Sequence, residues 1–157
     1  MKDMGNARYN MNCHITRNRK ALELKIDHRL YAELMVEAFD VKKGSKIPAT
    51  SWVSTLSKAE ESRNPEEKDE MRKFPCREAV GALMWMATMT GLDIASAVRA
   101  VARFCENPGS AHKKAVIKIM QHFLHTKDWG IAYGRQGYVL CMNVYTNLDF
   151  GACLDMR

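Results

Sequence analysis

The sequence has no apolar run long enough to cross a lipid bilayer. Its longest, Ala79–Met89, is interrupted by Gly81 and Thr88 and falls well short of the roughly 18 residues that a membrane-spanning helix needs. Residues 1–6 lack the apolar core of a secretory signal peptide. We therefore expect no membrane partner and an intracellular protein, in the cytoplasm or the nucleus.

The five cysteines form no Cys-x-x-Cys motif, and their number is odd. This pattern argues against a disulfide framework and indicates a reducing compartment. Cys13 and His14 are adjacent, but neighbouring strand residues point to opposite faces, so we expect no nucleophile–base pair. His122 and His125 lack the tight ligand pairs of a zinc site, so we expect no metal and no cofactor.

The chain has 157 residues, of which 46% are hydrophobic. That is enough for a packed core in one ordinary domain or two small ones. The formal net charge is +6 and the sequence pI is about 9.1. Such a balance is typical of proteins with a polyanionic partner, although a solvated basic surface would have the same composition.

Apolar and polar residues alternate from Tyr9 to Ile15 and from Leu22 to Ile26, which predicts an N-terminal β-hairpin around a polar turn at residues 18–20. Residues 130–134 and 138–150 look extended around a turn at 135–137 and suggest a second, C-terminal hairpin. A boundary is expected near residue 134. We therefore predict an α+β fold with a mainly helical middle.

Five helices are predicted from apolar residues three or four positions apart and from start and stop signals. The expected N-caps are Asp27, Asn64, Asp93 and Ser110, and Gly91 is an expected stop. The helix from Arg77 to Thr90 is apolar nearly all round and is expected in the core. Three other helices are expected to turn one row of apolar residues inward. In the helix after Asp27 this row is Leu30, Tyr31, Leu34, Met35 and Ala38. In the helix after Asp93 it is Ile94, Val98, Val101 and Cys105, and in the helix after Ser110 it is Val116, Ile119, Met120 and Phe123.

Basic side chains recur at helical spacing on two predicted helices. Arg99 and Arg103 share one face of the first, and Lys114, Lys118, His122 and His125 share one face of the second. Such faces are suited to following a phosphate backbone, while the alternative is an ordinary solvated face. Carboxylates at Asp149 and Asp155 are too few for a two-metal nuclease.

Several segments, in order and spacing, resemble copia-type retrotransposon Pol polyproteins. Met1–Gly5 resembles the family's Met-Lys-Asp-Leu-Gly, and Pro75–Met84 resembles Pro-Tyr-Arg-Glu-Ala-Val-Gly-Ser-Leu-Met. Asp93–Val98 resembles Asp-Ile-Ala-x-Ala-Val, Asn107–Val116 resembles Asn-Pro-Gly-x-x-His-Trp-x-Ala-Val, and Tyr145–Cys153 resembles Tyr-Ser-Asp-Ala-Asp-Trp-Ala-Gly-Cys.

The resemblance implies two parts. Residues 1–134 would be the C-terminal part of the reverse transcriptase, with a primer-grip-like hairpin at Met11 and Asn12 (Leu-Gly in the family) and thumb and connection helices. Residues 135–157 would be the truncated start of an RNase H domain.

The resemblance also implies a catalytically incomplete fragment. The family binds Mg²⁺ through an Asp-Asp pair that this chain lacks, and its first RNase H aspartate is Asn147 here. We expect no enzyme activity and, at most, weak binding of an RNA–DNA hybrid or duplex through Arg99, Arg103, Lys114 and Lys118. The alternative is an inert relic that self-associates through exposed apolar surface.

Overall fold

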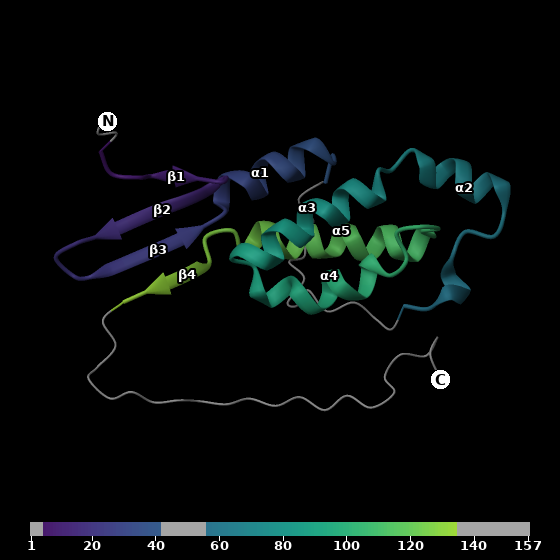
Figure 1. Cartoon of the computed structure of the whole chain (residues 1–157). Coiled ribbons are helices and arrows are strands. Elements are labelled where there is room, and N and C mark those ends of the chain that lie inside the picture. Colours follow the sequence, from purple (N-terminus) through teal and green to yellow (C-terminus); the bar gives the residue numbers. More distant parts are fainter. Residues whose placement is uncertain (1–4, 42–55, 135–157) are drawn as a thin grey trace, which may run out of the picture.

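The computed structural model describes residues 5–41 and 56–134, which form a four-stranded antiparallel sheet at one end of a helical body (Figure 1). The strands β1 (Tyr9–Asn10), β2 (Cys13–Asn18), β3 (Glu23–Asp27) and β4 (Gly130–Tyr133) are hydrogen-bonded in that order. The predicted α+β class is confirmed. Within the described ranges, no helix is long and apolar enough to cross a membrane.

A tight turn at Met11 and Asn12 divides the segment that we predicted as one strand. Asn10 pairs with Cys13 across the turn, and both turn residues have positive φ, 50° and 63°, as a type I′ hairpin requires. The alternation of apolar and polar residues from Tyr9 to Ile15 therefore spans two strands and the turn between them, and does not mark one continuous strand. Glycine adopts this conformation without strain and asparagine tolerates it, which gives a backbone reason for the family's glycine at position 12.

The extended segment predicted at residues 130–134 joins the N-terminal hairpin. β4 pairs antiparallel to β3, with Gly130 opposite Asp27 and Tyr133 opposite Leu24. A Cβ atom on Gly130 would lie 2.1 Å from the carbonyl oxygen of Ile26, so a side chain there would push the strand away. The second half of the predicted C-terminal hairpin and the whole of residues 135–157 lie outside the described residues.

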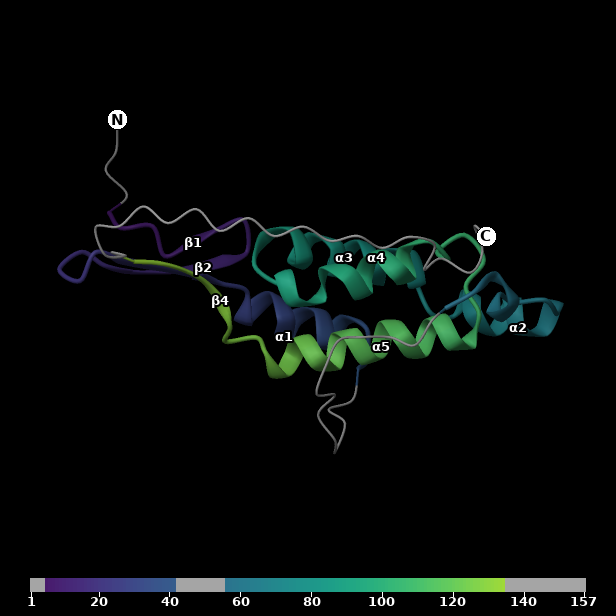
Figure 2. The same cartoon turned by 90° about the horizontal axis from the view of Figure 1, so that it is seen from below.

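The helices form two layers (Figure 2). α3 (Cys76–Met89) packs beside α4 (Ala95–Ala102) in one layer, and α1 (Arg29–Ala38) packs beside α5 (Ser110–His125) in the other. α2 (Pro65–Arg72) lies at the end remote from the sheet, and short 3-10 turns at Lys58–Glu60 and Leu92–Ile94 precede α2 and α4.

The core lies between the two layers and is filled mainly by α5 and α3. The inward stripe predicted for α5 is confirmed, since its four residues are buried. Two other expectations are partly wrong. In α1, Met35 of the predicted row is buried and Tyr31 packs against the core, but Leu30 and Leu34 face solvent and Ala32 is buried in their place. In α3, Met84 and Trp85 are exposed. α3 is therefore amphipathic, although its outer row contains apolar residues.

The Asn-Pro-Gly-x-x-His segment locks the start of α5 to the chain before α2. Ser62 Oγ donates to the carbonyl of Pro108 over 2.6 Å, and Asn107 Nδ2 donates to the carbonyl of Ser62 over 3.2 Å. The N–H of Gly109 donates to Nδ1 of His112 over 2.9 Å. Gly109, not the predicted Ser110, is thus the N-cap of α5.

Replacing Gly109 with alanine should destabilise the fold strongly. The added Cβ would lie 1.9 Å from the carbonyl oxygen of Glu60, so one of the two backbone segments must move, at a cost of about 3 kcal/mol. Gly81→Ala is the matched control, because its Cβ would meet nothing within 4 Å and alanine favours a helix by about 1 kcal/mol. Urea denaturation followed by circular dichroism should show a lower midpoint for the first variant and an equal or higher one for the second. Equal shifts would contradict the lock.

Candidate nucleic-acid interface

The four predicted phosphate-binding residues occupy two separate surfaces. Arg99 lies on α4 and Arg103 is its C-cap; both are exposed, and the Arg103 guanidinium lies over the ring of Phe104 at 5.2 Å. Lys114 is exposed and Lys118 half-buried on α5. Each pair lies opposite the buried row of its own helix, and the two helices belong to different layers (Figure 2). The structure therefore does not bring the four cations into one patch.

The predicted basic face of α5 is interrupted at His122. This side chain is buried, and its Nε2 lies 3.0 Å from a carboxylate oxygen of Asp93. The prediction placed His122 on the solvent side, but the 3-10 turn before α4 carries Asp93 over that part of α5. Asp93 lies inside this turn, so it does not serve as the predicted N-cap of α4; Ile94 has that position.

A ridge that the sequence reasoning missed runs along the outer side of α3. Its members are exposed and recur at helical spacing: Arg77, Glu78, Gly81, Met84, Trp85 and Thr88. We call this set the α3 ridge. Trp85 is 37% exposed and Met84 53%. The spacing of Arg77, Gly81 and Trp85, four residues apart, was available in the sequence, but the apolar composition of the helix obscured it.

Gly81 makes the middle of the α3 ridge flat. Nothing lies within 4 Å of the position that its Cβ would take, so a ligand can approach the helix backbone there. Trp85 on one side offers an exposed indole that can stack on a sugar or a base. Arg77 on the other side offers a guanidinium that can bind a phosphate in bidentate fashion.

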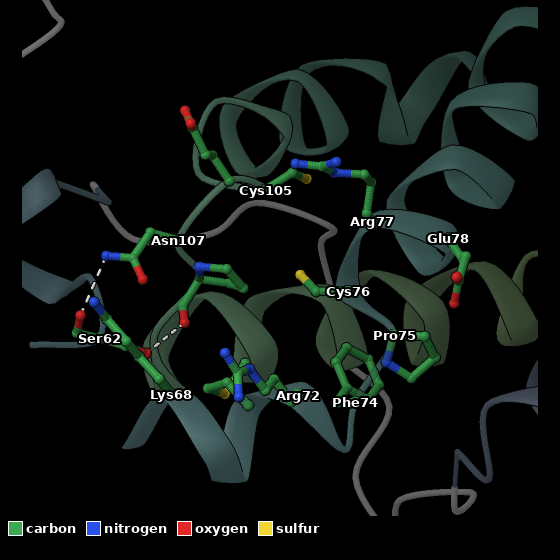
Figure 3. A pocket seen from close by; sticks show the side chains of 13 residues that line it. Ser62, Lys68, Arg72, Phe74, Pro75, Cys76, Arg77, Glu78, Cys105 and Asn107 are labelled. Atoms are coloured by element: carbon green, nitrogen blue, oxygen red, sulfur yellow. Dashed lines mark hydrogen bonds between the residues drawn. The ribbon is translucent and has the colours of Figure 1, made fainter. Parts of the chain in front are cut away.

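A pocket of about 530 Å³ opens beside the start of α3 (Figure 3). Three cationic side chains line it, Lys68, Arg72 and Arg77, together with Glu78 and Glu106. Arg72 also forms an exposed ion pair with Asp69, with 3.0 Å between Nη1 and Oδ1. The pocket thus continues the α3 ridge at the end that carries Arg77 and Glu78.

A buried thiol–imidazole pair lies where β2 meets α1. As predicted, Cys13 does not pair with His14; instead its sulfur lies 3.1 Å from Nε2 of His28, whose Nδ1 lies 2.6 Å from Oγ1 of Thr90. Burial and the charge of Asp27 raise the pKa of the Cys13 thiol, and burial lowers the pKa of His28. Both groups stay neutral and inaccessible, so the pair contributes to packing and is not a nucleophile.

Asp27 is a buried carboxylate that is held by Arg29 and His14. Burial by itself raises the pKa of this carboxyl, but hydrogen bonds from Arg29 and His14 outweigh it, so the pKa lies below its usual value. The guanidinium of Arg29 donates to the two carboxylate oxygens over 3.0 and 3.1 Å.

In residues 5–41 and 56–134, no group of three or more His, Cys, Asp or Glu side chains is arranged to bind a metal ion.

An apolar groove separates the Met11–Asn12 turn from α1. Its lining includes four exposed hydrophobic side chains, Tyr9, Met11, Leu30 and Leu34, around a volume of about 410 Å³. We call this the β1–α1 groove. The predicted primer-grip residues Met11 and Asn12 form one wall of it, and their grip function stays a prediction.

The fold should lose stability as the pH falls below 6.5. Burial lowers the folded-state pKa of His28 below its ordinary 6.5, so in acid the unfolded chain binds a proton that the folded chain does not. The free energy of unfolding therefore decreases from pH 6.5 toward the folded pKa and is insensitive to this group above 6.5. His112, whose pKa burial also lowers, adds to the same trend.

Urea denaturation at pH 7.5 and at pH 5.5 measures this dependence. The difference between the two unfolding free energies should be smaller in His28→Gln than in the parent chain. Removal of an exposed imidazole, His125→Gln, is the matched control. An unchanged difference in His28→Gln would show that His28 does not carry the effect.

Comparison with known proteins relates the chain to transposon polyproteins. It is 34% identical over 159 aligned residues, 100% of its own length, to the "Retrovirus-related Pol polyprotein from transposon TNT 1-94" of Nicotiana tabacum, of which it spans 12%. It is 26% identical over 87 residues to the "Secreted RxLR effector protein 161" of Plasmopara viticola, which is 55% of this chain and 61% of that protein. No protein family profile and no solved structure matches. From end to end, this chain is related to one segment of a retrovirus-related Pol polyprotein of a transposon.

Proposed function

We propose that the chain is a segment of a copia-type Pol polyprotein that follows the polymerase metal site and runs from the end of the reverse transcriptase into the start of RNase H. Its proposed activity is binding of an RNA–DNA hybrid, without catalysis of its own. The observation that carries this proposal is the α3 ridge. The end-to-end similarity to a transposon Pol polyprotein supports it.

The geometry of the α3 ridge suits the shallow minor groove of a hybrid duplex. A helix can lie along such a groove only where its side chains are short, and Gly81 provides that place in the middle of the ridge. Trp85 then lies one turn further along the helix and can pack on the exposed sugars. Arg77 lies one turn before Gly81 and can reach a phosphate.

The charge of the chain adds an attraction that does not depend on the ridge. The formal net charge is +6, and Arg99, Arg103, Lys114 and Lys118 are spread over two faces. Dispersed cations raise the local concentration of a polyanion and make its binding sensitive to salt. We therefore assign these four residues to attraction at long range and the α3 ridge to the contact itself.

The sequence supports the proposed lack of catalysis. The chain has no Asp-Asp pair. Where the family that it resembles has the first RNase H aspartate, this chain has Asn147. A neutral amide is a weak substitute for a carboxylate that binds Mg²⁺. Cleavage of a labelled hybrid in the presence of Mg²⁺ would contradict this part of the proposal.

Fluorescence anisotropy with a labelled RNA–DNA hybrid, measured across a salt series, tests the binding. We expect affinity to fall steeply with salt, with a slope that corresponds to several phosphates. Trp85→Ala should weaken binding about tenfold, or about 1.4 kcal/mol, because the indole no longer packs on the sugars. Gly81→Leu should weaken it at least as much, because the new side chain holds the helix away from the groove.

Two further variants separate the contact from general attraction. Ala38→Leu places the same leucine side chain on the exposed side of α1 and should bind like the parent chain. Replacing Arg99, Arg103, Lys114 and Lys118 together with Glu reverses the sign of the net charge and should abolish binding. If only this charge variant loses affinity, the α3 ridge is not the contact. No binding by the parent chain even at low salt would reject the whole proposal.

The β1–α1 groove favours a second candidate, self-association without any nucleic-acid activity. Its exposed apolar side chains would be shielded from water in a dimer or a larger assembly. Sedimentation velocity over a hundredfold range of protein concentration should then show an average molecular mass that rises with concentration. Leu34→Glu should then restore the monomer, whereas Leu92→Glu, also at an exposed leucine, should not. A monomer at every concentration would exclude it.

A further inference from the structure

A second pocket with basic walls lies in the sheet, where the chain that precedes β1 runs beside β2. It has a volume of about 430 Å³ and is lined by residues 6–8, 14–17 and 19. We call it the β2-edge pocket. The N–H of Ile15 donates to the carbonyl of Arg8 over 2.8 Å, and this bond holds the preceding chain against the strand.

Three arginines line the β2-edge pocket, and no aspartate or glutamate does. They are Arg8, Arg17 and Arg19, and all three are exposed. The guanidinium of Arg19 donates from Nη2 to Oδ1 of Asn6 over 2.9 Å, so its position is fixed by a neutral partner. Within residues 5–41 and 56–134, none of the three guanidinium groups forms an ion pair.

Two carboxylates of the sheet do not cancel this charge. Glu23 borders a neighbouring hollow together with Arg17 and Arg19, but it forms no ion pair with either of them. Asp27 is buried and is paired with Arg29. The β2-edge pocket therefore combines three positive charges that the described part of the protein leaves uncompensated.

The open edge of β2 adds a backbone donor to the pocket. Alternate residues of an antiparallel strand direct their N–H groups to opposite edges. The N–H of Ile15 points away from β3, toward Arg8, so the N–H of Arg17 points to the same outer edge. The pairing of β1 with β2 extends only to His14. In the described ranges, the N–H of Arg17 therefore has no strand partner and borders the pocket.

We propose that the β2-edge pocket binds the dianionic phosphate of a phosphomonoester, either at the end of a nucleic-acid strand or in a free nucleotide. Guanidinium groups bind phosphate oxygens in bidentate fashion. A phosphomonoester carries a charge of about −1.5 to −2 at pH 7, whereas a phosphodiester within a strand carries only one negative charge. Three guanidinium groups around one hollow therefore favour the terminal group.

The size of the β2-edge pocket agrees with this ligand. Sites for small ligands have volumes of about 300–1,000 Å³, and 430 Å³ accommodates a phosphate together with the sugar that it esterifies. The backbone of a continuous duplex reaches only the rim of such a hollow. The site is thus separate from the proposed hybrid contact on the α3 ridge.

Fluorescence anisotropy of the full chain with a short single-stranded oligonucleotide, labelled at its 3′ end, tests the proposal. The oligonucleotide with a 5′-phosphate should bind about tenfold more tightly than the same one with a 5′-hydroxyl, because charge-assisted hydrogen bonds to the terminal group are gained. Inorganic phosphate and uridine 5′-monophosphate should displace it at an ionic strength at which sodium chloride does not.

Variants locate the effect. Arg8→Gln and Arg17→Gln should each remove most of the preference for the 5′-phosphate. Arg17→Lys keeps the charge without the bidentate geometry and should retain part of it. Lys73→Gln changes the net charge equally at the end of α2, remote from the sheet (Figure 1), and should keep the full preference. Circular dichroism establishes that each variant folds.

The outcomes separate the two sources of phosphate and the two sites. Displacement that depends on Arg17, without a preference for the phosphorylated strand, would identify a free phosphomonoester as the ligand. Equal losses in Arg17→Gln and Lys73→Gln would overturn the site, and so would displacement by chloride as effective as by phosphate. Trp85→Ala should keep the preference, so that failure of the hybrid contact and failure of this site are distinguishable.

Discussion

The close contact between Gly109 and the carbonyl of Glu60 fixes where α5 begins, and the rest of the helical body depends on α5. A side chain at position 109 would force the two backbone segments apart, since a Cβ would lie 1.9 Å from that oxygen. His112 closes the turn from inside by accepting the N–H of Gly109 and stacking on Phe104. With its start fixed, α5 buries one face against α1, α3 and α4. These contacts in turn leave the outer side of α3 open as a ridge.

The sequence predicts the element types well, because periodicity and capping signals are local. α2 begins one residue after Asn64 and α3 one residue before Arg77. What periodicity does not determine is which of two apolar rows a helix buries. α1 has leucines on one side, and the side that packs inward carries Ala32 and Met35. The exposed leucines then become part of the β1–α1 groove.

The candidate interface was harder to predict, because periodicity does not determine which helix faces are buried or how the helices pack together. Charged residues at helical spacing are easy to recognise, so Arg99 and Lys114 were found, but their relative position depends on which layers α4 and α5 occupy. The ridge residues Gly81 and Trp85 lack charge and look like core residues in a sequence. Only the packing of α3 reveals that a glycine with open space around it lies next to an exposed indole.

The segments that resemble the copia-type pattern contribute mostly to packing. Asn107, Gly109 and His112 hold the start of α5, and Ala79, Val80 and Leu83 are buried in α3. The chain departs from that pattern at Lys113, where the pattern has Trp, and the Lys113 ammonium lies over the ring of Phe74 at 5.3 Å.

Residues that match the family therefore explain why the chain folds, and they carry little information on activity. A fragment could retain every one of these matches while its ability to bind nucleic acid was lost. The ridge is different, because an open glycine between an arginine and a tryptophan contributes nothing to the core. A binding function for this chain has to be argued from that surface and not from the length of the similarity.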